Sequence, residues 1–320
     1  MRKLTLAIAA FVLALSPSLS FAKTAPALAP AAAAAPSATA AATVAPADPE
    51  NLRPVAGVGQ PTDGAYGLQT QVTDNGRFAA WMHDSLLMPL ITVISLFVLG
   101  LLLYVVARYR RSANPMPSKT SHNTIIEVIW TGVPVLILAV VFIPSFTLLR
   151  AQYAKVGTNA ITLKATGNQW FWSYKYPDNG DFEIVANMLP EDVAKARGEP
   201  RLLAVDNRIL VPVNTPIKVI TTSNDVIHSW AVPAFWTKMD AVPGRLNETS
   251  FKADKIGLYY GQCSELCGAR HGFMPIAVEV VTMKRFNEWI LAHGGKVKGA
   301  PAGTSPTLVA AVTAPTAAKN

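Results

Sequence analysis

The stretch GQCSELCGARHGFMP, residues 261–275, places two thiols, one imidazole and one thioether within twelve residues of each other. Its candidate ligands follow one another at spacings of four, four and three residues: Cys263, Cys267, His271 and Met274. Thiolate, thioether and imidazole ligands together suit copper, whereas magnesium and calcium prefer oxygen ligands. The stretch therefore predicts a metal site, and the flanking sequence has to supply a fold that presents it.

A disulfide is the alternative, because these are the only two cysteines among the 320 residues. Two cysteines in a secreted protein normally form one disulfide. However, a bridge across so short a loop adds little chain-entropy stabilisation. It also leaves His271 and Met274 without a role, so the two additional ligands favour the metal site.

A further ligand has to come from elsewhere, and the chain has five histidines. His83 precedes an apolar run, His122 lies in a polar connection and His293 ends an amphipathic stretch, so each is expected to be solvated or interfacial. His228 instead lies in the apolar run VIHSWAVP, where a strand is expected. Because a buried imidazole needs a partner for each ring nitrogen, His228 is the candidate for the missing ligand.

Two apolar runs precede this region. Residues 85–107 are uncharged, and as a helix these 23 residues would be about 34 Å long, enough to cross a hydrocarbon core of roughly 30 Å. Residues 128–149 form a second such run. Prolines inside these runs are tolerated when neighbouring helices compensate for the lost hydrogen bonds. The lengths favour a two-helix transmembrane hairpin over residues 78–150 rather than a buried soluble hairpin.

Charge orients this hairpin. The connection between the two runs carries Arg108, Arg110, Arg111 and Lys119 and no acidic residue, so the positive-inside rule places it in the cytoplasm. Everything after Arg150 then lies in the periplasm of a multi-pass protein of a bacterial inner membrane. The net charge of +8 includes this connection and the basic N-terminus, and no nucleic-acid partner is expected.

The two ends of the chain differ in composition from the rest. Residues 1–22 have a basic start, a short apolar core and a Ser-Phe-Ala ending, a pattern typical of a secretory signal peptide. Residues 23–77 are expected to form an Ala- and Pro-rich flexible region, and residues 296–320 a disordered tail. Residues 151–295 remain for one periplasmic domain.

Residues 159–283 are predicted to be β-structure. The apolar and β-branched runs, broken by Pro, Gly, Asn and Asp, are NAITLKA, QWFWSYKY, RLLAV, RILVPV, IKVITT and PIAVEVV. Short strands at this spacing favour an antiparallel sandwich or barrel, and KRFNEWILAH, residues 284–293, predicts a closing amphipathic helix. Trp170, Trp172, Tyr174 and Tyr176 alternate at the strand period, so they are expected on one face, mostly in the core.

Four motifs, in order behind the two apolar runs, resemble subunit II of the haem-copper cytochrome c oxidases. They are GNQWFWSYKYP (167–177), SNDVIHSWAVP (223–233), DAVPGRLNETSF (240–251) and GLYYGQCSELCGARHGFMPI (257–276). The resemblance covers about residue 80 to about residue 290. It implies an all-β, cupredoxin-type Greek-key barrel whose metal loop joins two late strands, and a binuclear copper A centre in which two copper ions share one unpaired electron.

The resemblance also implies the ligands of this centre. Cys263 and Cys267 would bridge the two copper ions, and His228 and His271 would each bind one of them. Met274 would be a weak ligand of one ion, and the backbone carbonyl of Glu265 would bind the other. Two bridging thiolates would keep the geometry nearly unchanged on reduction, which favours fast electron transfer. A mononuclear blue copper site needs only one cysteine, so the second cysteine argues against it.

Further roles are implied for residues outside the copper ligands. Trp170 would lie where cytochrome c docks and passes its electron, and the side chain of Glu265 would bind magnesium or manganese at the interface with subunit I. Glu127 would lie at the mouth of a proton-uptake path, although an acid there can also simply stabilise a helix N-terminus. Lys175 stands where the family commonly has an acid, which leaves the charge of the donor cytochrome open; Asp225 is one candidate for an acidic docking patch.

The expected function is that of the electron-transfer subunit of a respiratory cytochrome c oxidase. The chain would accept electrons from cytochrome c and pass them to haem in subunit I, where oxygen is reduced to water with proton translocation. Subunits I and III and membrane lipid are the other implied partners, and no activity is expected without subunit I. The alternatives are subunit II of a quinol oxidase, which lacks the copper ligands, and a periplasmic copper-delivery protein, in which the two spans would have no use.

Overall fold

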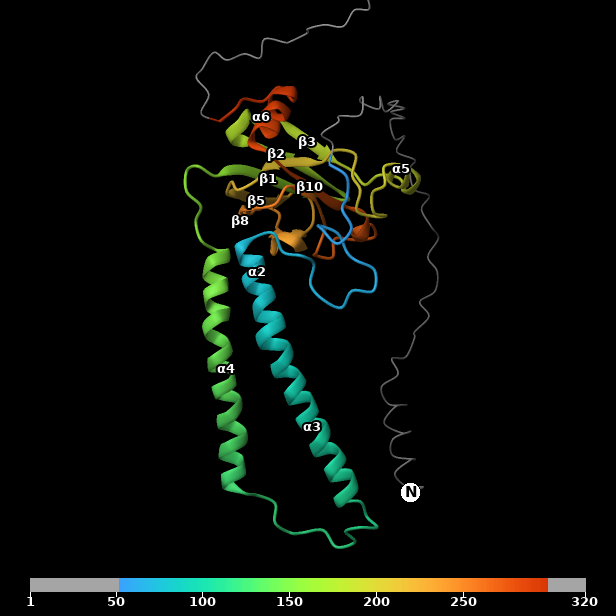
Figure 1. Ribbon diagram of the computed structural model, residues 1–320, viewed down its shortest axis with the longest axis vertical. Coiled ribbons are helices and arrows are strands. Elements are labelled where there is room, and N and C mark those ends of the chain that lie inside the picture. The colour runs from blue at the N-terminus through green and yellow to red at the C-terminus, as the bar shows by residue number, and fades with distance from the viewer. Residues whose placement is uncertain (1–51, 299–320) are drawn as a thin grey trace, which may run out of the picture. The chain divides into compact units, whose positions relative to one another are not determined.

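The computed structural model describes residues 52–298, which comprise a helical hairpin and a β-domain (Figure 1). The expected signal peptide at residues 1–22 lies outside the described residues, as do residues 23–51 of the N-terminal region and the tail beyond residue 298.

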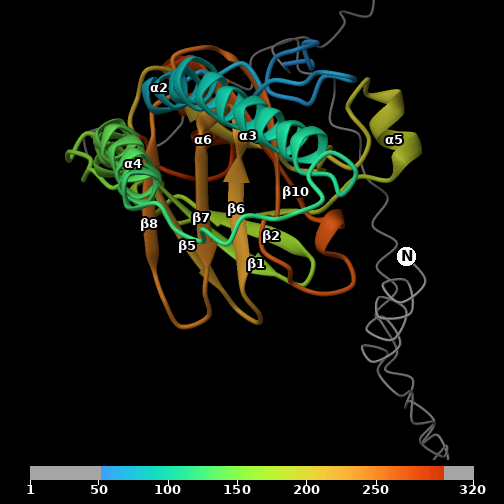
Figure 2. The same ribbon diagram turned by 90° about the horizontal axis from the view of Figure 1, so that it is seen from below.

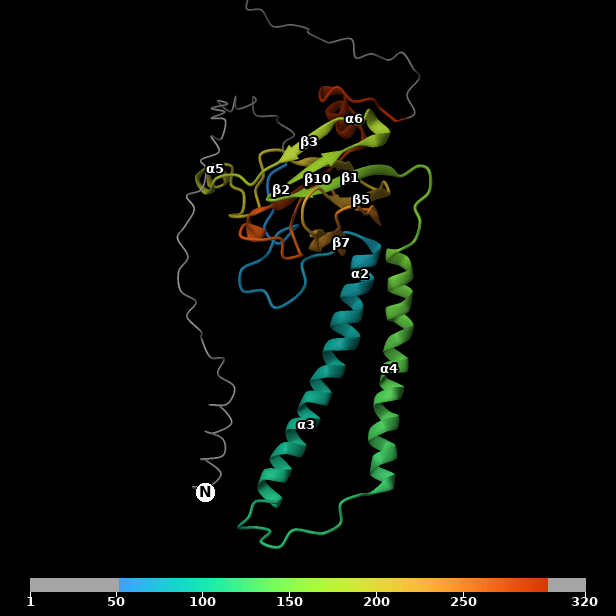
Figure 3. The same ribbon diagram turned by 180° about the vertical axis from the view of Figure 1, so that it is seen from behind.

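The hairpin consists of two long apolar helices. The first runs through α2 (Asp74–Trp81), the π-helical turn η1 (Met82–Leu87) and α3 (Met88–Arg108), and the second is α4 (Thr124–Gln152). Both are long and apolar enough to cross a membrane, and neither α3 nor α4 has a buried residue. Apolar surface of this extent is stable only when lipid or another protein covers it. The two predicted apolar helices are therefore present, and each is long enough to be a membrane span. Figures 1 and 3 show the helices connected at one end by the loop 109–123.

Capping residues explain where the helices begin. The Thr73 side chain accepts a hydrogen bond from a first-turn amide of α2 at 3.0 Å, and the Asn123 side chain accepts two from α4, at 3.1 and 3.2 Å. Pro89 lies inside this first helix, directly after the π-helical turn η1, so it does not mark a helix start. Both helices therefore begin before the apolar runs at residues 85 and 128, because a cap and not hydropathy sets a helix start.

Residues 52–73 run along the β-domain. Val72 is buried, and its amide donates to the carbonyl of Ala234 at 3.0 Å. The Gly59 carbonyl accepts a hydrogen bond from the Tyr260 amide at 2.7 Å. These contacts fall within residues 23–77, which the sequence predicts to be flexible, but they come after residue 50, where the Ala- and Pro-rich composition ends.

Ten strands of the described residues make up the β-domain. They are β1 (Ile161–Asn168), β2 (Phe171–Lys175), β3 (Glu183–Ala186), β4 (Ile209–Pro212), β5 (Ile217–Ser223), β6 (His228–Val232), β7 (Thr237–Ala241), β8 (Asn247–Phe251), β9 (Gly257–Gln262) and β10 (Pro275–Val281). They form a five-stranded sheet in the order β3-β2-β1-β5-β8, a three-stranded sheet in the order β4-β10-β9, and the pair β6-β7. Figure 2 shows β6 and β7 beside β5 and β8.

This is the expected all-β, cupredoxin-type domain, with one correction to its strand pairing. The pairs β1–β5 and β4–β10 are parallel, whereas an antiparallel arrangement was expected throughout. Both pairs join strands that are distant in sequence, which short-range patterning cannot predict. A second correction concerns RLLAV, which forms a turn because Leu202 adopts a φ of 65°; the Leu202 carbonyl accepts a hydrogen bond from the Gln262 side chain at 2.8 Å.

Short helices complete the domain. They are η2 (Pro177–Asn179), α5 (Glu191–Ala196), η3 (Pro233–Phe235), η4 (His271–Phe273) and α6 (Met283–Ala292). The last of these is the predicted closing helix: the Thr282 side chain caps it at 3.3 Å, and Phe286, Trp289 and Ile290 are buried.

The domain core also holds a charged cluster. The guanidinium of Arg208 lies 2.7 Å from a carboxylate oxygen of Glu199 and 2.5 Å from one of Glu279, and both carboxylates are almost completely buried. The hydroxyl of Tyr260, on β9, donates to Glu199 at 3.0 Å. One cation therefore compensates two buried carboxylates next to the strand that leads to the cysteines.

Candidate metal centre

The cysteines lie in the loop 263–274, between two paired strands. Strands β9 and β10 are antiparallel, and Gln262 is opposite Pro275, so the two ends of the loop are held next to each other. The amide of Ser264 donates to the carbonyl of Ser229 at 3.0 Å, which ties the loop to β6. His228 is the first residue of β6, so the loop and this histidine meet at one end of the domain.

Cys263 has two donor atoms close to its sulfur. Its Sγ lies 3.8 Å from Nδ1 of His228 and 3.4 Å from the carbonyl oxygen of Glu265. His228 is completely buried and begins a strand, as its apolar surroundings in the sequence predict.

Cys267 has a second, different pair of donors. Its Sγ lies 3.6 Å from Nδ1 of His271 and 3.5 Å from Sδ of Met274. The two sulfurs, of Cys263 and Cys267, are 3.9 Å apart, and both residues are free thiols. Each sulfur therefore has its own imidazole and its own weak donor, and the two sulfurs face each other in the middle.

These separations fit metal binding. In first-row sites a metal–thiolate bond is about 2.3 Å and a metal–imidazole bond about 2.0–2.1 Å, so two ligands of one tetrahedral metal lie roughly 3.4–3.8 Å apart. The neighbouring donors of this cluster are 3.4–3.9 Å apart. A disulfide would need about 2.05 Å between the sulfurs. Soft sulfur and imidazole donors at these distances suit copper.

The cluster lies at the boundary between core and solvent. Cys263 and Cys267 are 5% and 3% exposed and Met274 is buried, whereas His271 is partly exposed. The side chain of Glu265 points to solvent although its carbonyl faces Cys263. The sulfur donors are thus shielded from water, whereas a partner protein can reach the surface of the site at His271 and Glu265.

A carboxylate orients His228. Nε2 of His228 lies 2.8 Å from Oδ1 of Asp225, so the N–H is assigned to Nε2 and the Nδ1 lone pair is left toward Cys263. Asp225 also accepts hydrogen bonds from the amides of Gln169 and Val226, at 2.7 and 2.6 Å. Although burial opposes ionisation, these bonds lower the pKa of Asp225. From the sequence, Asp225 is expected only as a docking acid, although its position three residues before His228 is a signal for this contact.

The two thiols differ in acidity. Burial opposes ionisation of Cys263, but the neighbouring His228 side chain and hydrogen bonds with backbone groups lower its pKa to about 7. Burial and the neighbouring Cys263 thiolate raise the pKa of Cys267 to about 12. The first thiolate forms readily, and the second needs a cation beside it. The electrostatics of the cysteine pair therefore favour a bound metal.

Two glycines make room for the centre. A Cβ on Gly167, in β1, would lie 2.7–2.9 Å from three atoms of His228, and a Cβ on Gly261, in β9, would collide with the carbonyl oxygen of Ala231 in β6. Neither glycine can be predicted from the sequence, because a close approach between distant strands leaves no local pattern.

Trp170 touches the metal loop directly. Its indole N–H donates to the carbonyl of Cys267 at 3.2 Å, and the Gln169 side chain donates to the same carbonyl at 2.9 Å. Trp170 is partly buried in the turn before β2, whereas Trp172, Tyr174 and Tyr176 are fully buried. The core placement of these three rings is confirmed, and Trp170 is the one that reaches both solvent and the cluster.

Comparison with known proteins relates this site to a family. The family models of cytochrome c oxidase subunit II match its transmembrane domain at residues 61–148 and its periplasmic domain at residues 161–281. The probable cytochrome c oxidase subunit 2 of Rickettsia bellii is 47% identical over 228 residues, which are 71% of this chain and 82% of that protein. The chain belongs to the cytochrome c oxidase subunit II family.

Other relatives come from plants and bacteria. Cytochrome c oxidase subunit 2 of Zea mays is 45% identical over 229 residues, which are 70% of this chain and 87% of that protein. The crystal structure of the periplasmic domain of subunit II of cytochrome oxidase from Bradyrhizobium japonicum is 55% identical, covers 44% of this chain and 97% of that chain, and has a TM-score of 0.41. As a member of the subunit II family, the chain is a subunit of an oxidase complex and a membrane protein with a periplasmic domain.

The other residues for which the sequence predicts a role lie apart from the cysteines. Glu127 is in the first turn of α4, where its carboxylate accepts a hydrogen bond from the Asn123 amide at 3.2 Å. Lys175 pairs with Glu183 at 3.6 Å. His83 pairs with Asp84 at 2.7 Å. Among the histidines at residues 83, 122, 228, 271 and 293, all of which the structure describes, only two contact a cysteine.

Proposed function

We propose that the chain is the electron-accepting subunit of a respiratory cytochrome c oxidase in a bacterial inner membrane. It takes single electrons from cytochrome c and passes them to haem in subunit I, where oxygen is reduced to water with proton translocation; subunit III is a further partner. The observation that supports this function is the pair of facing thiols, 3.9 Å apart, each with its own imidazole. When bound by these ligands, a binuclear copper A centre supplies the one-electron redox chemistry.

The residues around the ligands hold them in place. His228 has partners at both ring nitrogens, the carbonyl of Cys267 accepts two hydrogen bonds, and the loop begins and ends at paired residues of β9 and β10. Ligands held in this way keep their positions when the charge of the centre changes. A small reorganisation on reduction follows, which is what rapid single-electron transfer requires.

Copper content and paramagnetic resonance of the purified full-length chain test this proposal. We expect two coppers per chain and a hyperfine pattern from one electron shared by two nuclei. Cys263→Ser should abolish that pattern, whereas Ser264→Ala, in the same loop but without a donor in the cluster, should retain it. One copper per chain with a mononuclear pattern would contradict the bridging role of the cysteines.

Trp170 is proposed as the residue through which electrons arrive. Its ring is partly exposed and its N–H contacts the carbonyl of Cys267, so it offers a short route from a docked cytochrome. In the assembled oxidase, Trp170→Ala should slow the oxidation of cytochrome c while copper stays bound. Trp170→Phe keeps the ring and loses the hydrogen bond, so it separates the two contributions. Unchanged kinetics in both variants would place electron acceptance elsewhere.

Glu127 is proposed to lie at the mouth of a proton-uptake path, and its contact with Asn123 offers a second explanation as a helix cap. Glu127→Gln keeps an oxygen that can accept the Asn123 amide but cannot titrate, whereas Glu127→Ala loses both functions. If Glu127 takes up protons, both variants should slow turnover equally. Normal turnover in Glu127→Gln with slow turnover in Glu127→Ala would assign the residue to capping.

The Glu265 side chain is proposed to bind magnesium or manganese at the interface with subunit I. The side chain is exposed while the carbonyl of the same residue faces Cys263, so the two ends can serve different metals. Glu265→Gln should therefore lower the manganese content of the assembled oxidase and leave the copper spectrum unchanged. Full manganese content in this variant would exclude the side chain as a ligand.

A further inference from the structure

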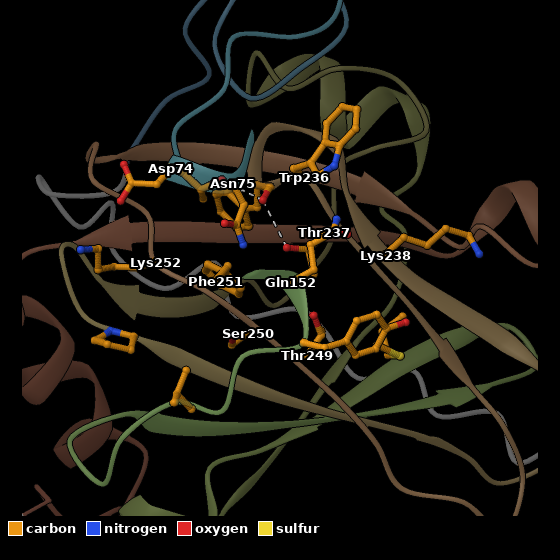
Figure 4. Close-up of a pocket in the computed structure, with 16 residues that line it drawn as sticks. Asp74, Asn75, Gln152, Trp236, Thr237, Lys238, Thr249, Ser250, Phe251 and Lys252 are labelled. Atoms are coloured by element: carbon orange, nitrogen blue, oxygen red, sulfur yellow. Dashed lines mark hydrogen bonds between the residues drawn. The ribbon is translucent and has the colours of Figure 1, made fainter. Parts of the chain in front are cut away.

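Three adjoining cavities surround the outer end of α4, where the chain leaves the second span. Their volumes are about 280, 280 and 380 Å³, and Gln152 lines all three. Figure 4 shows the first, which is lined by Asp74 and Asn75 at the start of α2, by Gln152, and by residues of β7 and β8. Small-molecule sites have volumes of roughly 300–1,000 Å³, so the third cavity lies near the lower end of this range and the other two lie just below it.

The position of the cavities relative to a bilayer follows from the chain itself. Helices able to cross a membrane extend over Asp74–Arg108 and Thr124–Gln152. Asp74 and Gln152, which line the first cavity, lie at the periplasmic ends of these helices. The Thr73 hydroxyl donates to the carbonyl of Phe235 at 3.0 Å and Arg77 pairs with Asp254 at 2.7 Å, so the start of α2 is bound to the β-domain. The cavities therefore lie at the level of the outer headgroups.

Charge in this region is uneven. The carboxylates beside the cavities are each paired with a cation, in the pairs Asp74–Arg77, Lys218–Glu248 and Lys238–Asp240. Lys155 and Lys252 also line the cavities, and within residues 52–298 neither has a carboxylate at ion-pair distance. Two uncompensated ammonium groups thus remain at the mouth of the site, which favours an anion.

The other lining groups suit a headgroup. Thr249 and Ser250 contribute hydroxyl groups to two of the cavities. Trp236 and Tyr153 contribute aromatic rings, which are enriched at membrane–water interfaces. Gln69 and Gln71 contribute side-chain amide groups to the third cavity, which suit hydrogen bonding with a headgroup hydroxyl or ammonium.

We propose that these cavities bind the phosphate headgroup of a membrane phospholipid. Lys155 and Lys252 neutralise the phosphate, the hydroxyls of Thr249 and Ser250 donate hydrogen bonds to its oxygens, and the acyl chains continue along the apolar surface of α4. The site would fasten the β-domain to the bilayer at the point where the second span enters it. Figure 4 shows Lys252 and Lys238 on opposite sides of the first cavity.

Native mass spectrometry of the purified full-length chain in detergent micelles tests this site. The probes are short-chain phosphatidylglycerol, glycerophosphate and inorganic phosphate, titrated separately. Each lysine near an anionic lipid contributes about fivefold to the affinity, so replacing both Lys155 and Lys252 by Gln should weaken lipid binding about 25-fold. The matched control is Lys195→Gln with Lys284→Gln, which removes two exposed lysines outside the cavities and should bind lipid as the unaltered chain does.

The outcomes separate the possible occupants. The proposal is supported if the unaltered chain and the control double variant retain phosphatidylglycerol and the Lys155→Gln, Lys252→Gln double variant loses it. Equal lipid binding by the two double variants overturns the proposal. Glycerophosphate or inorganic phosphate that binds as tightly as the lipid also overturns it, because the site would then be one for free phosphate. Protection of Lys252 from acetylation in delipidated, assembled oxidase would show that a protein subunit covers the cavity instead. Normal copper content in both double variants serves as the control for folding.

Discussion

Replacing Gly167 by alanine should weaken copper binding, because the added methyl group would press on a ligand. A Cβ at this position of β1 would lie 2.7 Å from Cδ2 of His228, whereas ordinary contacts begin at 3.4 Å. The ring would have to move by about 0.7 Å, the difference between these distances. Since Nε2 is 2.8 Å from Asp225, a shift of this size strains or breaks the hydrogen bond that orients the ring.

The size of the effect follows from this displacement. Forcing a methyl group into a packed site costs about 1–3 kcal/mol of unfolding free energy. Loss of the group that orients a metal-binding histidine lowers metal affinity about 10- to 100-fold, or about 1.4–2.8 kcal/mol. We therefore expect Gly167→Ala to fold, to be moderately less stable, and to bind copper at least tenfold more weakly.

Copper affinity would be measured by competition with a chelator, and stability by chemical denaturation of the purified chain. Gly272→Ala is the matched control, because a Cβ there meets open space in the same metal loop, and it should change neither quantity. Gly261→Ala should mainly reduce stability, since its Cβ meets backbone of β6 that cannot rotate away. Copper affinity in Gly167→Ala equal to that of Gly272→Ala would refute the reasoning.

Three other changes have definite expected outcomes. Arg208→Met leaves two buried carboxylates unpaired and should lower the unfolding free energy by about 3–5 kcal/mol in denaturant titrations, against less than about 1 kcal/mol for Arg201→Met at an exposed pair; equal losses would contradict this. Burial opposes ionisation of Asp178, but hydrogen bonds from Lys298 and a backbone amide lower its pKa, so its stabilising contribution is complete above pH 3.8 and is lost as the pH falls below that value. Asp178→Asn should thus be less stable at neutral pH, with a difference that closes in acid; a constant difference would exclude the charge as its source. Asp225→Ala should weaken copper binding about 10- to 100-fold in chelator competition, whereas Asp225→Asn, whose amide oxygen still accepts from the imidazole, should lose much less; equal losses would show that the carboxylate charge matters more than the hydrogen bond.

Features that depend on near neighbours in the chain could be predicted from the sequence. The two spans follow from uninterrupted apolar runs, and the closing helix from its amphipathic period. The grouping of Cys263, Cys267, His271 and Met274 follows from their short spacing, because a loop of this length keeps its side chains close together. The strand runs were also mostly found, apart from RLLAV, whose turn depends on a left-handed Leu202 that no residue preference indicates.

Features that depend on residues distant in the chain needed the tertiary structure. Sequence alone determined that this chain carries two spans, a β-domain and a thiol-rich metal loop, since apolar period and ligand spacing are local properties of the chain. The sequence indicates His228 as a ligand, but only the fold decided that it faces Cys263, that Asp225 orients it and that Gly167 leaves it room. The parallel pairs β1–β5 and β4–β10 belong to the same class. The physical reason is that packing between strands far apart in sequence sets these contacts, and such packing leaves no periodic signal along the chain.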